Sequence, residues 1–352
     1  MGFYQAMQLS AANLKPLIKN AESKETKNKY IAALILKSIL CLLFCTIVVI
    51  SFGKVFGEEN NVVGVVTVIS LLNFRFSNLD FKVRQAALTI VGIFGVLSIS
   101  PYIASISNPF LGFIINFISI IGILILTCHN VRLCNHSILV LSYFLLYGYK
   151  VENTEILINR IIGLIFGGIL VASIFYIKQR KIEFKNTFID IINDVDFNTE
   201  RTKWQLKFAF VTTSAIMIGE FLHIPRVMWI GIACMSVFHP DKSQLQIRYK
   251  QRMLYMVLGC LMYMSIYFLI PQQFRGLIGL IGGVMIGFSG TYKWQTVFNA
   301  FGALSAATPI LGVGGAIIFR ILNNVFGALY SKGFDYIINF IDNKEFANVN
   351  EA

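Results

Sequence analysis

The longest apolar stretches of this chain match the thickness of a lipid bilayer, and this feature constrains its fold more than any other. Ile31 to Phe52 and Ile156 to Ile177 each contain a single charged residue. A helix needs about 20 apolar residues to cross about 30 Å of hydrocarbon, whereas a barrel strand needs about ten alternating ones. With 56% hydrophobic and only 14% charged residues, the chain is also more apolar than a typical soluble domain. These observations predict an all-α polytopic membrane protein and argue against a barrel.

Shorter apolar stretches accompany these two and divide into two sets of six. The first set is Ile31–Phe52, Val62–Phe74, Ala86–Ile99, Phe110–Leu126, Ser137–Tyr147 and Ile156–Ile177. The second set is Phe208–Phe221, Val227–Phe238, Met253–Ile270, Leu277–Gly290, Val297–Leu311 and Ala316–Tyr330. We therefore expect about 12 transmembrane helices in two six-helix repeats, residues 31–177 and 204–331, joined by a linker at 178–203.

Three pairs of short motifs support a duplication. They are Leu36-Lys37 with Leu206-Lys207, Lys82-x-Arg84 with Lys250-x-Arg252, and Arg160-Ile161-x4-Phe166-Gly167 with Arg320-Ile321-x4-Phe326-Gly327. The members of the three pairs are offset by 170, 168 and 160 positions. Because six spans return the chain to its starting side, both copies have the same orientation, which predicts parallel repeats related by an axis along the membrane normal.

The net charge of +12 is concentrated in alternate loops. Lys and Arg gather in the N-terminal arm and in the segments 75–84, 178–207 and 242–252, while 54–60 and 100–108 contain one or none. The positive-inside rule places the rich segments in the cytoplasm, together with both termini. We therefore expect a cytoplasmic basic arm at 1–30 and a cytoplasmic tail at 332–352. Since orientation accounts for the charge, we expect no nucleic acid partner.

Two segments outside the spans have apolar residues at helical spacing. In the arm these are Phe3, Met7, Leu14, Leu17 and Ile18, and in the linker they are Phe184, Phe188, Ile191, Ile192 and Val195. We expect short amphipathic helices lying on the membrane surface. The arm has no apolar core of the kind a secretory signal needs, so we expect no cleaved signal peptide.

Val62–Phe74 and Val227–Phe238 occupy corresponding places in the two halves and are too short to span. A helix of 12 or 13 residues is about 19 Å long. Matching short segments in two repeats are typical of broken helices around a central transport site. Tilted or interfacial packing is the alternative interpretation.

Arginines at membrane depth are the main candidates for ligand binding. Arg320 and Arg160 lie inside apolar segments, where a charge costs about 2.5 to 3.5 kcal/mol or more. A guanidinium binds carboxylates through two parallel hydrogen bonds, so these residues predict a cationic groove. The alternative is snorkelling toward the headgroups. Arg252 and Arg84 either contact the substrate or mark the cytoplasmic headgroup boundary.

Other candidate residues complete this predicted site. Trp229 would cover an apolar ring, and Asn73 and Asn116 would supply hydrogen bonds. Glu220 and His223 are the best candidates for coupling to protonation, with a solvated loop as the alternative. The sequence has no phosphate-binding loop, zinc-binding helix or nucleophile elbow. We expect no cofactor, no metal and no enzymatic activity.

The segment around Trp229 carries a family resemblance. Trp229, His239-Pro240, Arg252 and Gly259, with a weaker copy at Arg84 and Gly92, resemble the fusaric-acid-resistance and aromatic-acid-exporter family of bacterial inner-membrane proteins. The resemblance implies export of small organic anions, often aromatic carboxylic acids. Members often carry a large cytoplasmic domain, for which the linker is too short, so an accessory export subunit is a further expectation.

Three rival functions remain open at this point. The membrane part of the plant malate channels is distantly similar, which keeps a passive organic-anion channel as one alternative. A non-transporting membrane scaffold is the second, and a membrane enzyme, which the scarcity of acids in the spans disfavours, is the third. The lipid bilayer and a small organic anion are the expected partners. A face formed by Gly279, Gly283 and Gly287 would serve either helix packing or a homo-oligomer.

Overall fold

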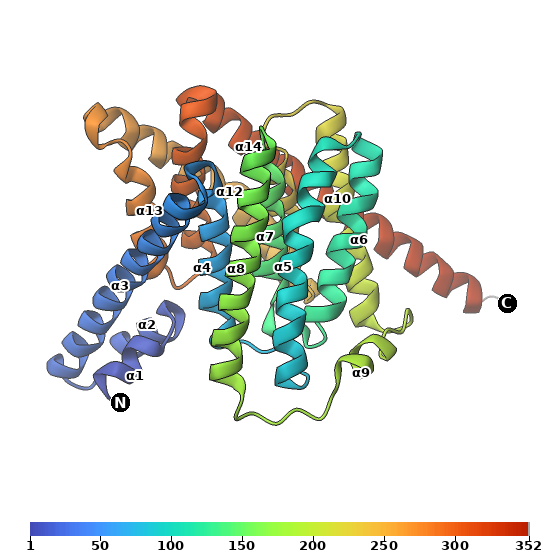
Figure 1. Ribbon diagram of the computed structural model, residues 1–352, viewed down its shortest axis with the longest axis horizontal. Coiled ribbons are helices and arrows are strands. Elements are labelled where there is room, and N and C mark those ends of the chain that lie inside the picture. Colours follow the sequence, from blue (N-terminus) through green and yellow to red (C-terminus); the bar gives the residue numbers. More distant parts are fainter. Residues whose placement is uncertain (351–352) are drawn as a thin grey trace. The chain divides into compact units, whose positions relative to one another are not determined.

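The computed structural model describes the backbone of residues 1–350, and their side chains except those of Lys242 and 341–350. Positions 351 and 352 of the predicted tail lie outside the described residues. Every regular element in 1–350 is a helix, as predicted (Figure 1). The α-helices are α1 (Phe3–Gln8), α2 (Ala11–Lys19), α3 (Lys24–Phe56), α4 (Asn61–Phe74), α5 (Val83–Ile106), α6 (Pro109–Thr127), α7 (His136–Gly148), α8 (Thr154–Gln179), α9 (Phe188–Asn193), α10 (Glu200–Phe221), α11 (Met228–Val237), α12 (Lys242–Leu269), α13 (Leu277–Phe288) and α14 (Tyr292–Asn350). Short 3₁₀ turns occur at Glu58–Asn60, Val131–Leu133 and Gln272–Phe274.

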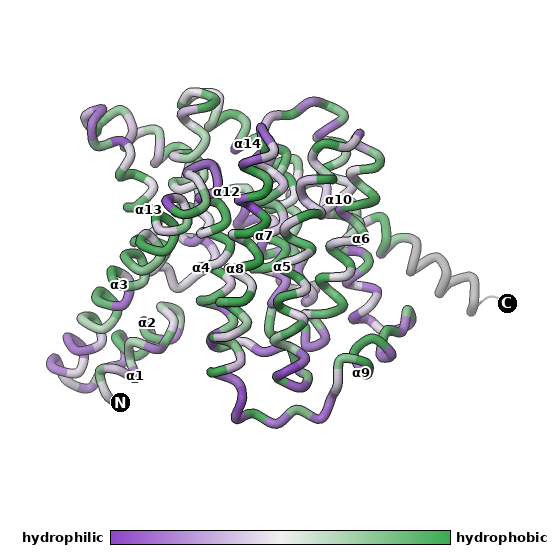
Figure 2. The backbone as a smooth tube through the Cα atoms, viewed as in Figure 1, coloured by the Kyte–Doolittle hydropathy of each residue, from purple (hydrophilic) through white to green (hydrophobic). Residues whose placement is uncertain are grey.

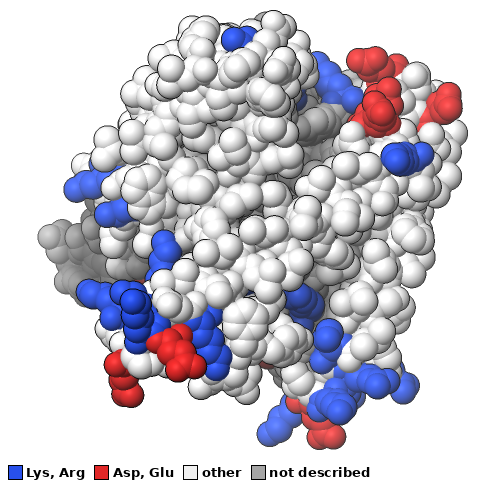
Figure 3. Space-filling model, turned by 90° about the vertical axis from the view of Figure 1, so that its left-hand side faces the viewer, with Lys and Arg blue, Asp and Glu red and all other residues white. Residues whose placement is uncertain are grey.

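Six helices in the described part of the chain are long and apolar enough to cross a membrane. They are α3, α5, α6, α8, α12 from Ser243, and α14 as far as Phe340. All twelve predicted apolar stretches are mainly helical, and the last two share α14, which is interrupted at Gly312 where φ is 68°. The count of twelve spans therefore stays a prediction. Figure 2 shows apolar residues along the middle of most helices, and Figure 3 shows one face that is largely free of charged side chains away from its edges.

Several helices begin earlier than predicted. The segment 242–252 was expected to be a loop, but it forms the first part of α12. Asp241 precedes this helix, and its Oδ1 accepts hydrogen bonds from the backbone nitrogen of Ser243 at 2.9 Å and from its hydroxyl at 2.7 Å. The polar residues that follow are mostly good helix formers, so the helix extends beyond its apolar part.

The chain forms two compact units. Unit 1 comprises Met1–Ile47 and Gln246–Val325, and unit 2 comprises Val48–Leu245 and Phe326–Ala352. Each unit combines parts of both predicted halves, so the proposed duplication stays a prediction.

Three short helices form the interior of unit 2. α7 packs against both α4 and α11, while the longer helices α5, α8 and α10 pack against one or more of the three. With 14, 13 and 10 residues, α4, α7 and α11 are about 15 to 21 Å long. Since helices of this length cannot cross a bilayer alone, their polar ends must be satisfied by protein rather than lipid. Gly167 of α8 allows close approach to α4, because a Cβ there would lie 2.2 Å from the hydroxyl oxygen of Thr67.

Loops at one end of unit 2 are joined by polar contacts. The side chain of Asn135 donates to the carbonyl oxygens of Asn78 at 2.9 Å and Thr127 at 3.0 Å. The backbone nitrogen of Lys82 donates to the carbonyl oxygen of Asn186 at 2.9 Å. Thus the loops after α4, α6 and α8 lie at the same end, and much of the Lys and Arg of unit 2 lies in or beside them.

In unit 1, close contacts at glycines bring the helices together. A Cβ at Gly283 would lie 2.8 Å from Leu42 of α3, and one at Gly287 would lie 2.9 Å from Ser38. On α12, a Cβ at Gly259 would lie 2.5 Å from the carbonyl oxygen of Val297 on α14. The glycine face of α13 is therefore used at least partly for packing within the chain.

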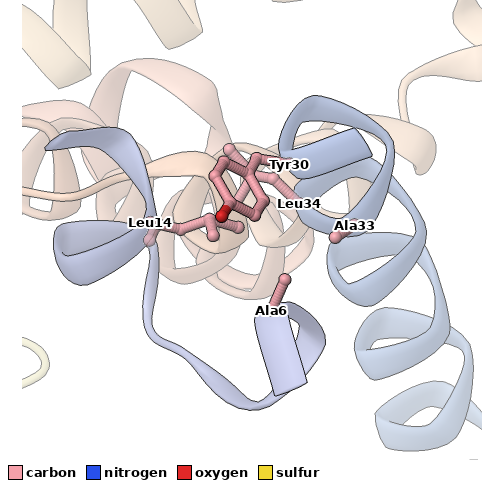
Figure 4. Close-up of a cluster of buried hydrophobic side chains, with 6 residues drawn as sticks. Ala6, Leu14, Tyr30, Ala33 and Leu34 are labelled. Atoms are coloured by element: carbon pink, nitrogen blue, oxygen red, sulfur yellow. The ribbon is translucent and has the colours of Figure 1, made fainter. Parts of the chain in front are cut away.

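The N-terminal arm folds onto α3. Ala6 of α1 and Leu14 of α2 are fully buried against Tyr30, Ala33 and Leu34 (Figure 4). The Nζ of Lys37 donates a hydrogen bond to the carbonyl oxygen of Leu9. Leu14 was predicted to face the membrane surface, but it packs on α3, because the chain turns between α2 and α3. Phe3 and Leu17 remain exposed. In the linker, α9 is shorter than the predicted amphipathic helix: it begins at Phe188, after Phe184.

Candidate functional site

Two arginines are buried in unit 1 although the sequence placed one of them at a loop boundary. Arg252 and Arg320 are each 4% exposed. Because α12 begins at Lys242, Arg252 lies about 15 Å along that helix. Its Nε and Nη2 donate to the Oδ1 of Asn324 at 3.0 and 2.7 Å. The amide nitrogen of Asn324 in turn donates to the carbonyl oxygen of Arg320 at 2.7 Å, which fixes the amide oxygen toward Arg252.

The surroundings of these arginines lack carboxylates. No Asp or Glu occurs between Lys242 and Phe334 in the sequence. The sequence of unit 1 contains two acids, Glu22 and Glu25, and both are exposed. An amide oxygen accepts hydrogen bonds but carries no net charge, so Asn324 orients Arg252 without neutralising it. Burial of a charge costs several kcal/mol unless an opposite charge accompanies it. The part of unit 1 that the structure describes therefore forms a cationic centre with no internal carboxylate.

Unit 2 contains a third buried arginine with a similar polar partner. Arg160 is 3% exposed, and its Nε donates to the Oδ1 of Asn60 at 3.0 Å. Its Nη1 donates to the carbonyl oxygen of Tyr149 at 2.6 Å, while Nη2 is buried with no hydrogen-bond partner among the described residues. The amide nitrogen of Asn60 donates to the carbonyl oxygens of Phe56 and Ile156 at 2.9 and 3.0 Å. The amide oxygen of Asn60 is thus directed at Arg160.

The burial of Arg160, Arg252 and Arg320 argues against the snorkelling alternative. A snorkelling side chain extends along the helix surface so that its charge reaches the headgroup layer. Arg160 and Arg320 are instead enclosed by protein. This geometry favours an internal role for both residues.

The predicted coupling pair is arranged differently from expectation. Glu220 accepts a hydrogen bond from the hydroxyl of Tyr147 at 2.9 Å. One turn away on α7, the hydroxyl of Tyr143 donates to the Oδ1 of Asn116 at 2.8 Å. His223 is exposed, has a left-handed backbone with φ of 51°, and contacts Glu220 through its backbone nitrogen at 3.0 Å. Thus Glu220 reaches into unit 2, whereas the His223 side chain lies at its surface.

The remaining predicted residues of unit 2 have different surroundings. Arg84 is exposed in the first turn of α5. Asn73 donates to the Oδ1 of Asn135 at 3.3 Å, among the loops at the basic end. Trp229 is 2% exposed in the first turn of α11. Arg252 and Arg320 are the members of the predicted set in unit 1, where Asn324 joins them.

Three residues that matter in this geometry were not predicted as site residues. Asn60 and Asn324 position the buried arginines, and Tyr147 binds Glu220. For Asn324 the available signal was an asparagine in the same apolar segment as Arg320, whereas Asn60 lies in a different part of the sequence from Arg160 and Tyr147 in a different part from Glu220. Among the described residues, no group of three or more His, Cys, Asp or Glu side chains could hold a metal.

The fold and the buried arginines define the class: a multi-pass helical membrane protein with cationic centres enclosed by protein. Residues 214–331 match a family described as fusaric acid resistance protein-like. The matched third of the chain contains α11, Arg252, Arg320 and Asn324, and it confirms the predicted resemblance. The match indicates a membrane protein of the efflux and resistance type. No curated protein and no solved structure gives a significant match.

Proposed function

We propose that this chain is an integral membrane transporter that exports small organic anions, with aromatic carboxylic acids as its substrates. The carrying observation is the pair Arg252 and Arg320, both 4% exposed in a stretch of sequence without a single acid. A carboxylate ligand would supply the negative charge that the stretch from Lys242 to Phe334 lacks. Binding would then be reversible, because the counter-charge enters and leaves with the substrate.

The hydrogen bonds of Arg252 suit this role. Asn324 accepts from Nε and Nη2, and Nη1 is not among the donors to this amide. A guanidinium holds a carboxylate best when its planar fork is fixed in advance. Asn324 supplies that orientation without competing as an anion. In our proposal, a substrate carboxylate approaches the Nη1 side of Arg252 and is also stabilised by the charge of Arg320.

The aromatic part of the proposal is supported by the same face of α12. Tyr263 follows Arg252 by about three turns and is 1% exposed. Its ring lies 6.0 Å from that of Phe301 on α14, in an edge-on arrangement. Because about three helical turns, or about 16 Å, separate Tyr263 from Arg252, this ring would contact the aromatic part of a substrate at another point of the path than the one where Arg252 holds the carboxylate. Trp229 belongs to unit 2, and its predicted role in binding an apolar ring stays a prediction.

Proton coupling through Glu220 is part of the proposal. Glu220 accepts a hydrogen bond from Tyr147 inside unit 2, whereas His223 is exposed, so Glu220 is the stronger candidate.

We also propose the bacterial inner membrane as the location, with both termini in the cytoplasm. The clustering of basic loops at one end of unit 2 supports this orientation. A homo-oligomer and an accessory export subunit stay predictions.

A passive organic-anion channel is the second candidate. The observation that favours it is the absence of acids from Lys242 to Phe334, because a proton-coupled carrier needs titratable groups near its substrate. A channel would pass aromatic carboxylates down their gradient with no coupled ion.

Counter-flow into proteoliposomes tests both candidates. Vesicles containing the full chain and unlabelled benzoate should accumulate labelled benzoate, and Arg320→Ala at equal protein density should reduce the uptake more than tenfold. Arg180→Ala is the matched control, because Arg180 is exposed at the end of α8. Conductance in planar bilayers without counter-flow would favour the channel. If no panel of aromatic or aliphatic carboxylates gives flux or conductance, the proposed function is wrong.

A further inference from the structure

A groove of about 790 Å³ opens on unit 2 between α5 and α6. Its lining is mainly aliphatic and includes Leu88, Ile93, Val96, Ile118, Ile123 and Leu126. None of the buried arginines or their asparagine partners lines it. The groove is therefore separate from the proposed anion site.

Two glycines keep this groove open. Gly92 of α5 and Gly122 of α6 both line it, and a Cβ at either position would meet no atom within 4 Å. Leu88 and Ile118 on its walls are 72% and 62% exposed, so the groove faces outward from unit 2. In a membrane-spanning helix pair, an outward apolar face meets lipid chains.

The groove is long enough to hold a lipid chain. Its lining runs from Gln85 to Ser100 along α5, which corresponds to about 22 Å of helix. One leaflet of the hydrocarbon core is about 15 Å thick, half of the full core. The groove thus extends from the level where α5 begins to beyond the depth of a single leaflet.

The helix α9 lies at the end of the groove where α5 begins (Figure 1). Its first backbone nitrogen, of Phe188, donates to the Oε1 of Gln85 at 2.8 Å. Phe188 and Ile189 both line the groove, and Ile189 is 65% exposed. This end of unit 2 also contains the basic loops, so the groove begins at the level expected for headgroups.

Exposed basic side chains surround this end. Lys82 and Arg84 flank the start of α5, and Lys185 precedes α9. An acidic side chain also lies here: the Oδ2 of Asp190 accepts from the backbone nitrogen and the hydroxyl of Thr187 at 2.7 and 2.8 Å, and its carboxylate interacts electrostatically with Lys82. The start of a helix also favours a negative group. An apolar groove that ends at a cluster of Lys and Arg is complementary to an anionic amphiphile.

We propose that this groove binds an acyl chain of an anionic phospholipid, with the headgroup phosphate held by Lys82 and Arg84. The inference assigns Arg84 to a lipid rather than to the transported substrate. It does not depend on the proposed transport function, because it concerns a different surface and a different ligand. Each basic residue near a membrane surface attracts anionic lipid.

Native mass spectrometry of the full chain, delipidated and then titrated with dioleoyl phosphatidylglycerol or dioleoyl phosphatidylcholine, tests the proposal. We expect the wild-type chain to retain one phosphatidylglycerol about tenfold more strongly than phosphatidylcholine. Lys82→Ala with Arg84→Ala should remove this preference, and these exposed positions should tolerate the change. Gly92→Leu with Gly122→Leu should weaken retention of both lipids by filling the groove.

Gly95→Leu is the matched control, because a Cβ there also meets no atom within 4 Å but Gly95 does not line the groove. It should retain both lipids like the wild type. Equal retention of the two lipids by the wild type, or unchanged phosphatidylglycerol binding after the groove is filled, would overturn the proposal. Conversion of a dimer to a monomer by the filled groove would show that a second copy occupies it instead. Competition between benzoate and the lipid would assign the groove to the substrate.

Discussion

In both units an asparagine oxygen accepts hydrogen bonds from a buried arginine, but unit 1 contains two such arginines and unit 2 contains one. In unit 2, Arg160 is held by the Asn60 amide oxygen and by the carbonyl oxygen of Tyr149. In unit 1, one asparagine connects two buried arginines, because Asn324 accepts from Arg252 and donates to the backbone of Arg320. A neutral amide can fix the position of a guanidinium in either place. Only unit 1 combines that arrangement with two charges, which makes its need for an anion greater.

The largest effect should follow removal of a charge from unit 1. We expect Arg252→Ala or Arg320→Ala to reduce counter-flow of an aromatic carboxylate more than tenfold, since each contributes charge to the same acid-free centre. Flux measured at matched protein density in vesicles checks this. Arg180→Ala should retain wild-type flux. If both unit 1 variants transport normally, Arg252 and Arg320 contribute no more to transport than the exposed Arg180.

A substitution that supplies an internal anion should have the next largest effect. Asn324→Asp would place a carboxylate against Arg252, and the ion pair would compete with substrate. We expect the apparent KM for benzoate to rise about tenfold, while the new ion pair with Arg252 offsets part of the stability lost with the hydrogen bond from the Asn324 amide to the carbonyl oxygen of Arg320. Asn60→Asp beside Arg160 should raise KM far less. Equal effects at the two positions would remove the distinction between the units.

Changes at Arg160 should affect stability more than transport. Arg160→Ala leaves the oxygens of Asn60 and Tyr149 without their donor, which costs about 1 to 3 kcal/mol for each buried group that stays unpaired. We expect a lower melting temperature in detergent and at most a few-fold loss of flux by the folded fraction. A complete loss of flux at wild-type stability would place Arg160 in the transport site instead.

The smallest effect should come from the hydroxyl that binds Glu220. Tyr147→Phe removes the 2.9 Å hydrogen bond and keeps the ring. If Glu220 couples transport to protons, uptake driven by a pH gradient should fall a few-fold while exchange without a gradient stays the same. Parallel measurements on the same vesicles compare the two modes. An equal change in both would indicate a structural role for this pair.

The apolar pattern predicted the short interior helices well but not the surroundings of the charged residues. Val62–Phe74 and Val227–Phe238 correspond closely to α4 and α11, because residues that interrupt helices flank such segments, as Pro225 and Pro240 do on either side of α11. The position of Arg252 was harder to predict, because it depends on where α12 begins. The polar residues from Lys242 onward form the first turns of that helix rather than a loop. The partners of the arginines depend on contacts between distant segments, as with Asn60 and Arg160, which hydropathy does not encode.

Equilibrium binding of radiolabelled benzoate to the purified full chain tests the central claim most directly, because it measures the anion at the site without requiring flux. We predict saturable binding of one benzoate per chain, lost in the double variant Arg252→Ala with Arg320→Ala and strongly weakened in Asn324→Asp. Arg180→Ala should bind like the wild type. Saturable binding that survives removal of both arginines would contradict the account.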